Sequence, residues 1–340
     1  MPNVLAAIAA FGAMIFFHEL GHFLVARRAG VRVHVFALGF GPRVFSWQRG
    51  ETTYALNLLP LGGFVRMEGE DDARTGADSF RAKSVGARAA IVAAGPIMNL
   101  LLAVVILAIA AATGGIPTGA STRVGTVEAG WPAQAAGLHP GDVIVAIDGV
   151  SMTSGDQIIE TIHKSAGRPL TLTVRRGTEE LTINATPRLD EVRGVGRIGF
   201  SPEPTWTRLS PVQALGWGFQ RTGQFVVMLG EAIGRLIQEG KFFESLGGPV
   251  AAGSILVQAA QTGAQTFLHM AAFLSVIIGV FNLLPIPALD GGRLAFLAVE
   301  AVRRRPLDPR REGLVHMVGF ALLLLLLVGL TLRDVRRLPL

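Results

Sequence analysis

The sequence has no cysteine in its 340 residues and few charged residues. The absence of cysteine excludes disulfide bonds, thiolate metal ligands and a cysteine nucleophile. Asp, Glu, Lys and Arg make up 16% of the chain, whereas 50% of it is apolar and the mean hydropathy is +0.46. This composition excludes a disordered or fibrous protein. Because the apolar residues come in long runs, it also argues against a single soluble domain.

Lysine is scarce as well, although the chain is basic. The formal net charge is +6, and only three of the 31 basic residues are lysine. A nucleic-acid-binding surface would need a compact basic face with interleaved aromatic side chains, and no such pattern occurs. We therefore expect no nucleic-acid partner.

Four segments are apolar enough over about 20 residues to cross a bilayer as helices. We expect these spans at 4–26, 88–113, 267–290 and 313–332. Ten of the thirteen basic residues that flank the spans lie on one side of the membrane if the N-terminus is outside the cytoplasm. The positive-inside rule then makes that side cytoplasmic and places the long segment between the second and third spans outside.

The first half of the membrane core (1–113) contains a glycine-rich segment at 31–68, between its two spans. Short alternating stretches such as Thr53–Leu58, and a turn at Gln48–Glu51, indicate a β-hairpin. We expect this hairpin to dip into the membrane region, where non-helical backbone persists only if it is buried in protein or lines a wet cavity. An ordinary cytoplasmic hairpin is the alternative.

The segment 120–190 is polar enough to form a soluble domain. Its run from Gly137 to Gly149, followed by an expected helix over 154–165 and a hairpin around Arg176, resembles a bacterial PDZ domain. Such domains bind extended chains by adding a strand to a sheet edge. A spacer domain without a ligand is the alternative.

The segment 201–265 is expected to join this domain to the second half of the membrane core (266–340). Ser201–Pro211 is rich in proline, and we expect it to be a linker. Val212–Gln238 has apolar residues at helical spacing with charged residues between them. This pattern favours an amphipathic helix on the membrane surface over a fifth span.

The strongest chemical signal is His18-Glu19-Leu20-Gly21-His22, inside the first span. Two histidines four residues apart share one helix face and can hold one Zn²⁺. The adjacent Glu19 can then act as the base that activates a metal-bound water. Ionisable residues inside an apolar span are costly and are functional by default.

A catalytic zinc site needs a third protein ligand. Apart from Glu19, the one carboxylate embedded in a membrane-spanning stretch is Asp290, at the end of the third span. His18 lies about fourteen residues into the first span, roughly 21 Å deep, so both ligand sets reach a similar level near the cytoplasmic side. Pro285 and Pro287 interrupt the helix just before Asp290 and suit the wall of a cavity.

The remaining histidines are not in ligand spacing with any other candidate, and we expect loop or interface roles for them. They are His34, His139, His163, His269 and His316.

These motifs together resemble the site-2 protease family of intramembrane zinc metalloproteases. The resemblance rests on the motif in the first span, the run Gly95–Asn99, the PDZ-like insertion and the Asn-x-x-Pro-x-Pro-x-Leu-Asp-Gly run that starts at Asn282. It covers nearly the whole chain, in the order of the family. The chain looks closest to the bacterial branch that includes the regulator of sigma-E protease, with room for one PDZ domain.

The resemblance implies a multi-pass α-helical membrane protein with about four transmembrane helices, a membrane-associated β-hairpin region and an inserted α+β PDZ-like domain. It implies a bacterial inner or plasma membrane, with that domain outside the cytoplasm. The partners that the resemblance implies for the protein are the lipid bilayer and transmembrane substrates. These substrates have already been trimmed on the outer side of the membrane, as anti-sigma factors or signal-peptide remnants are.

The resemblance also assigns roles to residues. It implies one Zn²⁺ held by His18, His22 and Asp290, with Glu19 as general base and later proton donor. It implies that Asn282 holds the substrate backbone or a developing oxyanion. It further implies that the hairpin lines the cleft, and the residues expected there for close approach of the substrate backbone are Gly39, Gly41, Gly62 and Gly63.

Two other classes of protein compete with a protease. A membrane-tethered PDZ adaptor would need a decayed zinc site, and the complete ligand set with Glu19 argues against decay. An ion transporter would favour inverted repeats and broken helices in both halves of the chain. The sequence shows no repeat, and only the third span is broken.

Overall fold

The computed structural model describes residues 1–70, 76–191, 193–241, 245 and 247–337. These residues form two compact units, which we describe separately. The first unit, here called the membrane unit, comprises Met1–Ala110 and Pro211–Leu340, and the second, the α+β domain, comprises Ala111–Ser210.

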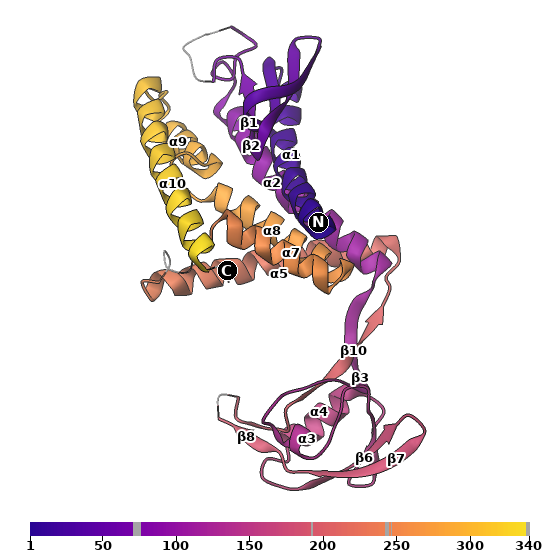
Figure 1. Cartoon of the computed structure of the whole chain (residues 1–340). Helices are drawn as coiled ribbons and strands as arrows, with labels where there is room; N and C mark the ends of the chain where they lie inside the picture. Colours follow the sequence, from indigo (N-terminus) through magenta and orange to yellow (C-terminus); the bar gives the residue numbers. More distant parts are fainter. Residues whose placement is uncertain (71–75, 192, 242–244, 246, 338–340) are drawn as a thin grey trace. The chain divides into compact units, whose positions relative to one another are not determined.

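In its described residues, the membrane unit consists of helices and the two-stranded sheet β1-β2 (Figure 1). Its elements are α1 (Pro2–Arg28), β1 (Val33–Arg49), β2 (Thr52–Met67), α2 (Val85–Thr113), α5 (Pro211–Gln238), α7 (Pro249–Thr262), α8 (Ala264–Leu283), α9 (Asp290–Arg303) and α10 (Pro309–Arg337).

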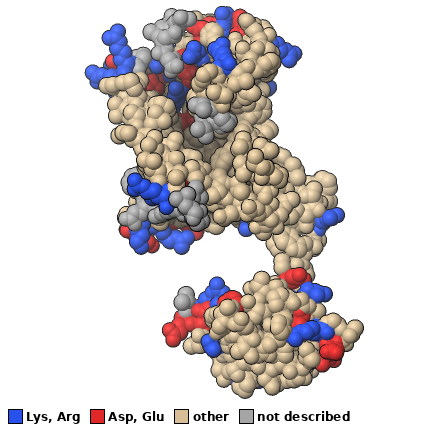
Figure 2. Space-filling view, in the orientation of Figure 1, with Lys and Arg blue, Asp and Glu red and all other residues tan. Residues whose placement is uncertain are grey.

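Four of the described helices are long and apolar enough to cross a membrane, namely α1, α2, α8 and α10. Figure 2 shows a mostly uncharged band between the charged ends of this unit, as a lipid-facing surface requires. The amphipathic helix α5 is not among the four. The third predicted span is shorter than expected: α8 ends at Leu283, because Pro285 and Pro287 cannot continue it, and Asp290 begins α9 instead.

The chain folds β1 and β2 back on themselves, so that each contributes two paired stretches. Residues 33–38 pair with 63–67 on one side and with 53–56 on the other, and 52–57 also pair with 43–49. The stretch 63–67 is therefore at one edge and 53–56 is in the interior. A hairpin is confirmed, but its alternating stretch Thr53–Leu58 is not a free edge.

An aromatic cluster attaches this sheet to α1. The ring of Phe36 in β1 makes edge contacts with Phe16 and Phe23 of α1, with centroids 5.8 and 5.3 Å apart. Tyr54 of β2 contacts Phe23 from the next strand. Such pairs add to the stabilisation from burial, and they fix the sheet beside the helix that carries the histidine motif.

Helices α1 and α2 cross in close contact at Gly21. A Cβ atom at this position would lie 2.3 Å from the backbone oxygen of Ala94. Any side chain would therefore push the helices apart. The glycine between the two histidines thus decides how near α2 comes to them.

The α+β domain is built on one sheet with a buried aliphatic core (Figure 1). The sheet order is β10-β3-β4-β6-β7, with β5 paired to β4, and β8 pairs with β9 separately. The elements are β3 (Ile116–Val127), α3 (Pro132–Ala135), β4 (Val143–Ile147), β5 (Val150–Ser151), α4 (Gly155–His163), β6 (Leu170–Arg176), β7 (Glu179–Ala185), β8 (Arg188–Asp190), β9 (Val195–Arg197) and β10 (Phe200–Thr207).

The expectation of a linker at Ser201–Pro211 is wrong for most of this segment. Phe200–Thr207 forms the strand β10, which pairs antiparallel with β3 from Val127 to Ile116. Proline lacks a backbone donor and is tolerated on an edge strand. Because β10 lies at the end of the sheet order, Pro202 and Pro204 fit there, and their presence does not indicate a linker.

An ion pair between buried Asp142 and partly exposed Arg176 joins the loop before β4 to β6. Asp142 is 2% exposed and accepts two hydrogen bonds of 2.8 Å from the Arg176 guanidinium and one of 2.9 Å from the backbone N–H of His139. The hydrogen bonds from Arg176 hold the pKa of the Asp142 carboxyl below its usual value. The charged form of Asp142 therefore stabilises the folded domain.

We predict that Asp142→Asn destabilises the α+β domain by about 2–3 kcal/mol at pH 7, because charge-assisted hydrogen bonds are lost. The folded pKa is depressed, so the stabilisation is complete above the unfolded value of about 4 and is lost as the pH falls below it. Hydrogen exchange of β4 and β6 peptides, in the full-length protein in detergent, measures this. A difference between wild type and variant that persists unchanged to the lowest pH would contradict the assignment.

Candidate metal centre

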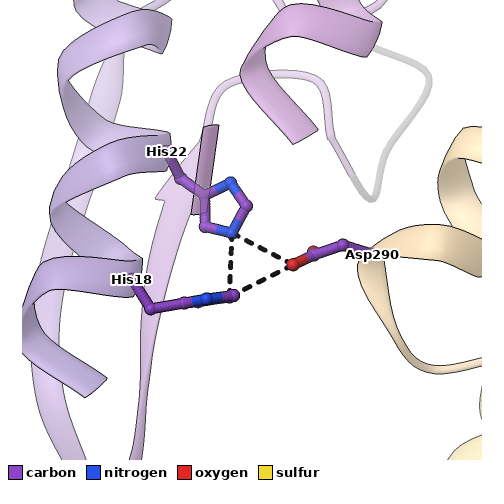
Figure 3. Close-up of side chains that lie close together, drawn as sticks. All are labelled: His18, His22 and Asp290. Carbon is purple, nitrogen blue, oxygen red and sulfur yellow. Dashed lines mark hydrogen bonds and ion pairs between the residues drawn. The ribbon is translucent and has the colours of Figure 1, made fainter. Parts of the chain in front are cut away.

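Three side chains that can bind a metal converge in the membrane unit (Figure 3). His18 and His22 lie one turn apart on α1, and Asp290 is the first residue of α9. Nε2 of His18 lies 3.2 Å from Nε2 of His22, and Oδ2 of Asp290 lies 3.1 and 3.4 Å from these two atoms. The structure thus brings Asp290 next to two histidines that precede it by 268 or more positions in the sequence.

These distances fit a zinc ion. Zinc ligands at about 2.0–2.1 Å in a tetrahedron are about 3.4 Å apart, close to the separations observed here. Oδ2 of Asp290 is buried and accepts no hydrogen bond from any residue that the structure describes. A buried anionic oxygen beside two imidazoles requires a cation or protons, and a Zn²⁺ ion supplies that charge.

The backbone of α2 orients His22. Nδ1 of His22 lies 2.9 Å from the carbonyl oxygen of Ile91, in a buried contact. A carbonyl accepts but never donates, so Nδ1 carries the proton and Nε2 keeps its lone pair for a metal. Such partners of the ligands tune affinity and fix the tautomer.

Asn99 of α2 lies beside His18 and is fully buried. Its Nδ2 atom lies 3.3 Å from Nδ1 of His18, whereas its Oδ1 atom has no hydrogen-bond partner among the described residues. A metal on Nε2 of His18 would require the proton on Nδ1, and the amide would then have to be turned over so that Oδ1 accepts that proton. Ser275 of α8 holds Asn99 in turn, by donating a 2.8 Å hydrogen bond to its backbone carbonyl.

Gly95 leaves the space that the two imidazoles occupy. A Cβ atom there would lie 2.2 Å from Nε2 of His22 and 2.9 Å from Nε2 of His18. Those are the metal-facing atoms, so a side chain at this position and a metal centre cannot coexist without rearrangement. The run Gly95–Asn99 therefore supplies both a bare surface and an orienting amide.

Helix α9, which carries Asp290, is fixed by ion pairs to other elements. Arg88 of α2 donates two hydrogen bonds, of 3.1 and 2.6 Å, to the carboxylate of Glu300. Arg293, one turn after Asp290, pairs with Glu70 beyond the end of β2. Bidentate and weakly exposed pairs of this kind are geometrically specific, so they limit how α9 can rotate.

Glu19 lines a cavity of about 690 Å³ beside the three candidate ligands. Its Cγ atom would lie 2.7 Å from a Cβ atom at Gly63, so the carboxylate side chain rests against the bare backbone of the edge stretch 63–67. The cavity is also lined by His18, His22, Phe40, Phe64, Val65, Arg66, Met67, Glu70, Asn282, Asp290, Arg293 and His316.

Some of the other predicted site residues line this cavity, and others do not. Asn282 lines it at the end of α8, where its Nδ2 donates a 3.0 Å hydrogen bond to the Ile278 carbonyl. Gly63 lines it, and Gly62, with φ +111°, lies against the ring of Phe40.

The other two glycines lie further along the hairpin. Gly39 and Gly41 have positive φ on either side of Phe40, at the fold between the two stretches of β1. Phe40 lines the cavity, whereas neither of these glycines does. Their positive φ values form the turn that places Phe40 at the cavity.

Three residues next to the centre were not predicted from the sequence to take part in it. Asn99 and Gly95 lie in a run that carried the family resemblance but received no role of its own. His316 was expected to be unrelated because it is not in ligand spacing. No sequence signal would have revealed it, since its contact is with a backbone N–H group of the loop before Asp290.

Comparison with known proteins agrees with this geometry. The family model "Peptidase family M50" matches residues 6–326. The chain is 33% identical over 419 positions to the zinc metalloprotease RasP of Geobacillus kaustophilus, covering 99% of this chain and 98% of that relative. It is 32% identical over 421 positions to the regulator of sigma-W protease RasP of Bacillus subtilis, covering 99% of each.

A solved structure is similar to one part of the chain. The PDZ domain of the SdrC-like protein from Listeria monocytogenes is 28% identical, with a TM-score of 0.23, and the match covers 25% of this chain and 90% of that one.

We predict that Asp290→Ala weakens Zn²⁺ binding by more than about 100-fold, since changes even to outer-shell partners typically cost 10–100-fold. Metal analysis of the purified protein after dialysis against a weak chelator measures the loss. The matched control is Asp308→Ala, an exposed aspartate outside the centre, which should keep one Zn²⁺ per chain. Full zinc retention in Asp290→Ala would place the third ligand elsewhere.

Proposed function

Since the chain belongs to peptidase family M50, we propose that this zinc metallopeptidase cleaves peptide bonds within or near transmembrane segments of other membrane proteins. The observation that carries the proposal is the position of the ligand pair. His18 and His22 lie in the apolar helix α1, one of four helices suited to cross a membrane. A hydrolytic centre at that depth acts on chains that are themselves in the membrane.

In this proposal His18, His22 and Asp290 hold the Zn²⁺. When bound, the ion acts as a Lewis acid on the scissile carbonyl and lowers the pKa of a water to about 7. The Ile91 carbonyl holds His22 in the ligating tautomer, and Asn99, with its amide turned over, would do the same for His18. The protein therefore presents a preorganised centre with room for water and substrate in the cavity.

Glu19 is the general base. It follows His18 directly and lines the same cavity. Its carboxylate accepts the proton of the attacking water and then delivers it to the amine that leaves. Asn282, on the cavity wall formed by the end of α8, holds the substrate backbone in this proposal.

The edge stretch 63–67 is the surface on which we propose that substrate is extended. A transmembrane helix satisfies its own backbone, and unwinding it in hydrocarbon leaves unpaired N–H and C=O groups. Among the residues that the structure describes, the stretch 63–67 pairs with a strand on one side only, and at Gly63 it touches Glu19. It can therefore replace the lost hydrogen bonds at the point of cleavage, a role that the interior stretch 53–56 cannot fill.

The physiological substrates that we propose are membrane-embedded regulators and remnants already trimmed outside, such as anti-sigma factors and leftover signal peptides. The naming of one relative as a regulator of sigma-W protease supports this class. We place the protein in a bacterial cell membrane, with the α+β domain as a PDZ-like module outside the cytoplasm that limits access to the centre.

We predict that Glu19→Gln keeps Zn²⁺ but lowers the cleavage rate by about 10²–10⁴-fold, because an amide cannot accept the proton of the attacking water. Cleavage of a transmembrane peptide in detergent micelles is followed alongside metal analysis. Glu51→Gln, at an exposed turn of the hairpin, should leave both readouts unchanged. Near-normal turnover in Glu19→Gln would assign the base to another group.

We also predict that every second backbone N–H group of the substrate, counted along the chain around the scissile bond, contributes to cleavage. Replacing one amide at a time by an ester removes a donor, and only alternate donors of an extended strand face a neighbouring edge. Each facing position should lower kcat/KM by about 2–13-fold, as expected for a net hydrogen bond of about 0.5–1.5 kcal/mol. A scan without period two would rule out strand pairing and leave the hairpin as a scaffold.

A further inference from the structure

The loop that delivers Asp290 has a backbone conformation that needs outside support. It runs from the end of α8 at Leu283 to the start of α9, and Ala288 within it has φ +77°. Residues with a Cβ atom rarely adopt this left-handed region, and they persist there only where surrounding contacts determine it. The support must act within two residues of a metal ligand.

Helix α10 provides a contact at this position. The backbone N–H of Ala288 donates a hydrogen bond of 3.1 Å to Nδ1 of His316. Nδ1 is therefore the acceptor, and the imidazole proton is on Nε2. The His316 ring also packs against Phe296 of α9, with ring centroids 5.4 Å apart. One side chain thus contacts both the loop before Asp290 and the helix after it.

A second contact lies one turn further along the same face of α10. A Cβ atom at Gly319 would lie 2.4 Å from Cβ of Pro287 and 2.9 Å from its carbonyl carbon. The bare backbone of Gly319 therefore lets α10 approach the residue just before Ala288. His316 and Gly319 are three residues apart, so both face the loop.

These contacts are notable because α10 is otherwise weakly packed within the chain. None of the residues in its most apolar stretch is buried in the part of the protein that the structure describes. Near its other end, Asp334 is buried and accepts a 2.9 Å hydrogen bond from the backbone N–H of Ala251, at the start of α7. The helix is thus attached at specific points, and one of them is the ligand loop.

We propose that His316 is a positioning residue for the metal centre. By accepting the Ala288 N–H it holds the loop in the conformation that points Asp290 at His18 and His22, and Gly319 sets the distance at which it does so. This inference rests on the proposed metal site. It adds that the fourth apolar helix, which supplies no ligand, controls metal affinity through the third ligand.

The test uses the full-length protein in detergent micelles and measures Zn²⁺ affinity by competition with a chelator. His316→Leu removes the acceptor and should weaken binding by about 10–100-fold, as for other outer-shell partners. Oδ1 of asparagine, like Nδ1 of histidine, is one bond from Cγ and can accept the same hydrogen bond. The Zn²⁺ affinity of His316→Asn should therefore lie within about threefold of the wild-type affinity. His316→Gln offers the same amide one bond further out and should resemble His316→Leu.

Gly319→Ala tests the second contact, and Gly329→Ala is its matched control on the same helix. A Cβ atom at Gly329 would meet nothing within 4 Å, so this control should bind Zn²⁺ as wild type does. Gly319→Ala should weaken binding by about tenfold or more. The Co²⁺-substituted proteins provide a second readout, because a displaced Asp290 alters the d–d absorption bands of a tetrahedral centre.

Wild-type affinity in His316→Leu, equal losses in His316→Asn and His316→Leu, or equal behaviour of the two glycine variants would each overturn the proposal. If His316→Leu fails to fold, the asparagine and glycine variants still decide it. Failure of wild type itself to bind Zn²⁺ would instead overturn the metal site on which the inference rests.

Discussion

Two imidazoles inside an apolar helix impose the constraint on which the rest of the membrane unit depends. Lipid offers no hydrogen-bond partners, so every polar atom of His18 and His22 must be satisfied by protein or by a metal. Helix α2 supplies a carbonyl and an amide to the Nδ1 atoms, and α9 supplies a carboxylate facing the Nε2 atoms. The helices are arranged around this requirement.

Close approach makes that arrangement possible, and glycine makes the close approach possible. Gly21 lets α1 meet α2, Gly95 leaves room for the imidazoles, and Gly319 brings α10 to the loop before Asp290. At each position a Cβ atom would lie less than 2.5 Å from a neighbour. The centre is therefore assembled where backbones come into contact, which is where a small displacement most affects ligand geometry.

The same constraint applies to the folded-back hairpin at the membrane depth that we propose for it. Non-helical backbone is tolerated at membrane depth only where it is paired or lines a cavity. Most of β1 and β2 is paired internally, and the edge stretch beside Glu19 borders the cavity. The proposed cleavage of unwound helices and the presence of a sheet in a helical membrane unit thus have one physical origin.

The sequence by itself predicted the apolar helices, and it placed His18, His22 and Glu19 together on one of them and Asp290 at the end of another. These predictions depend on local spacing and on the cost of charge in lipid. Tertiary structure alone decided which hairpin stretch is the edge, that Pro202 and Pro204 belong to a strand, and that Asn99 lies beside His18 and His316 beside the loop before Asp290. Edges and outer partners depend on contacts between residues distant in sequence, often with backbone groups, and such contacts leave no periodicity or spacing to read.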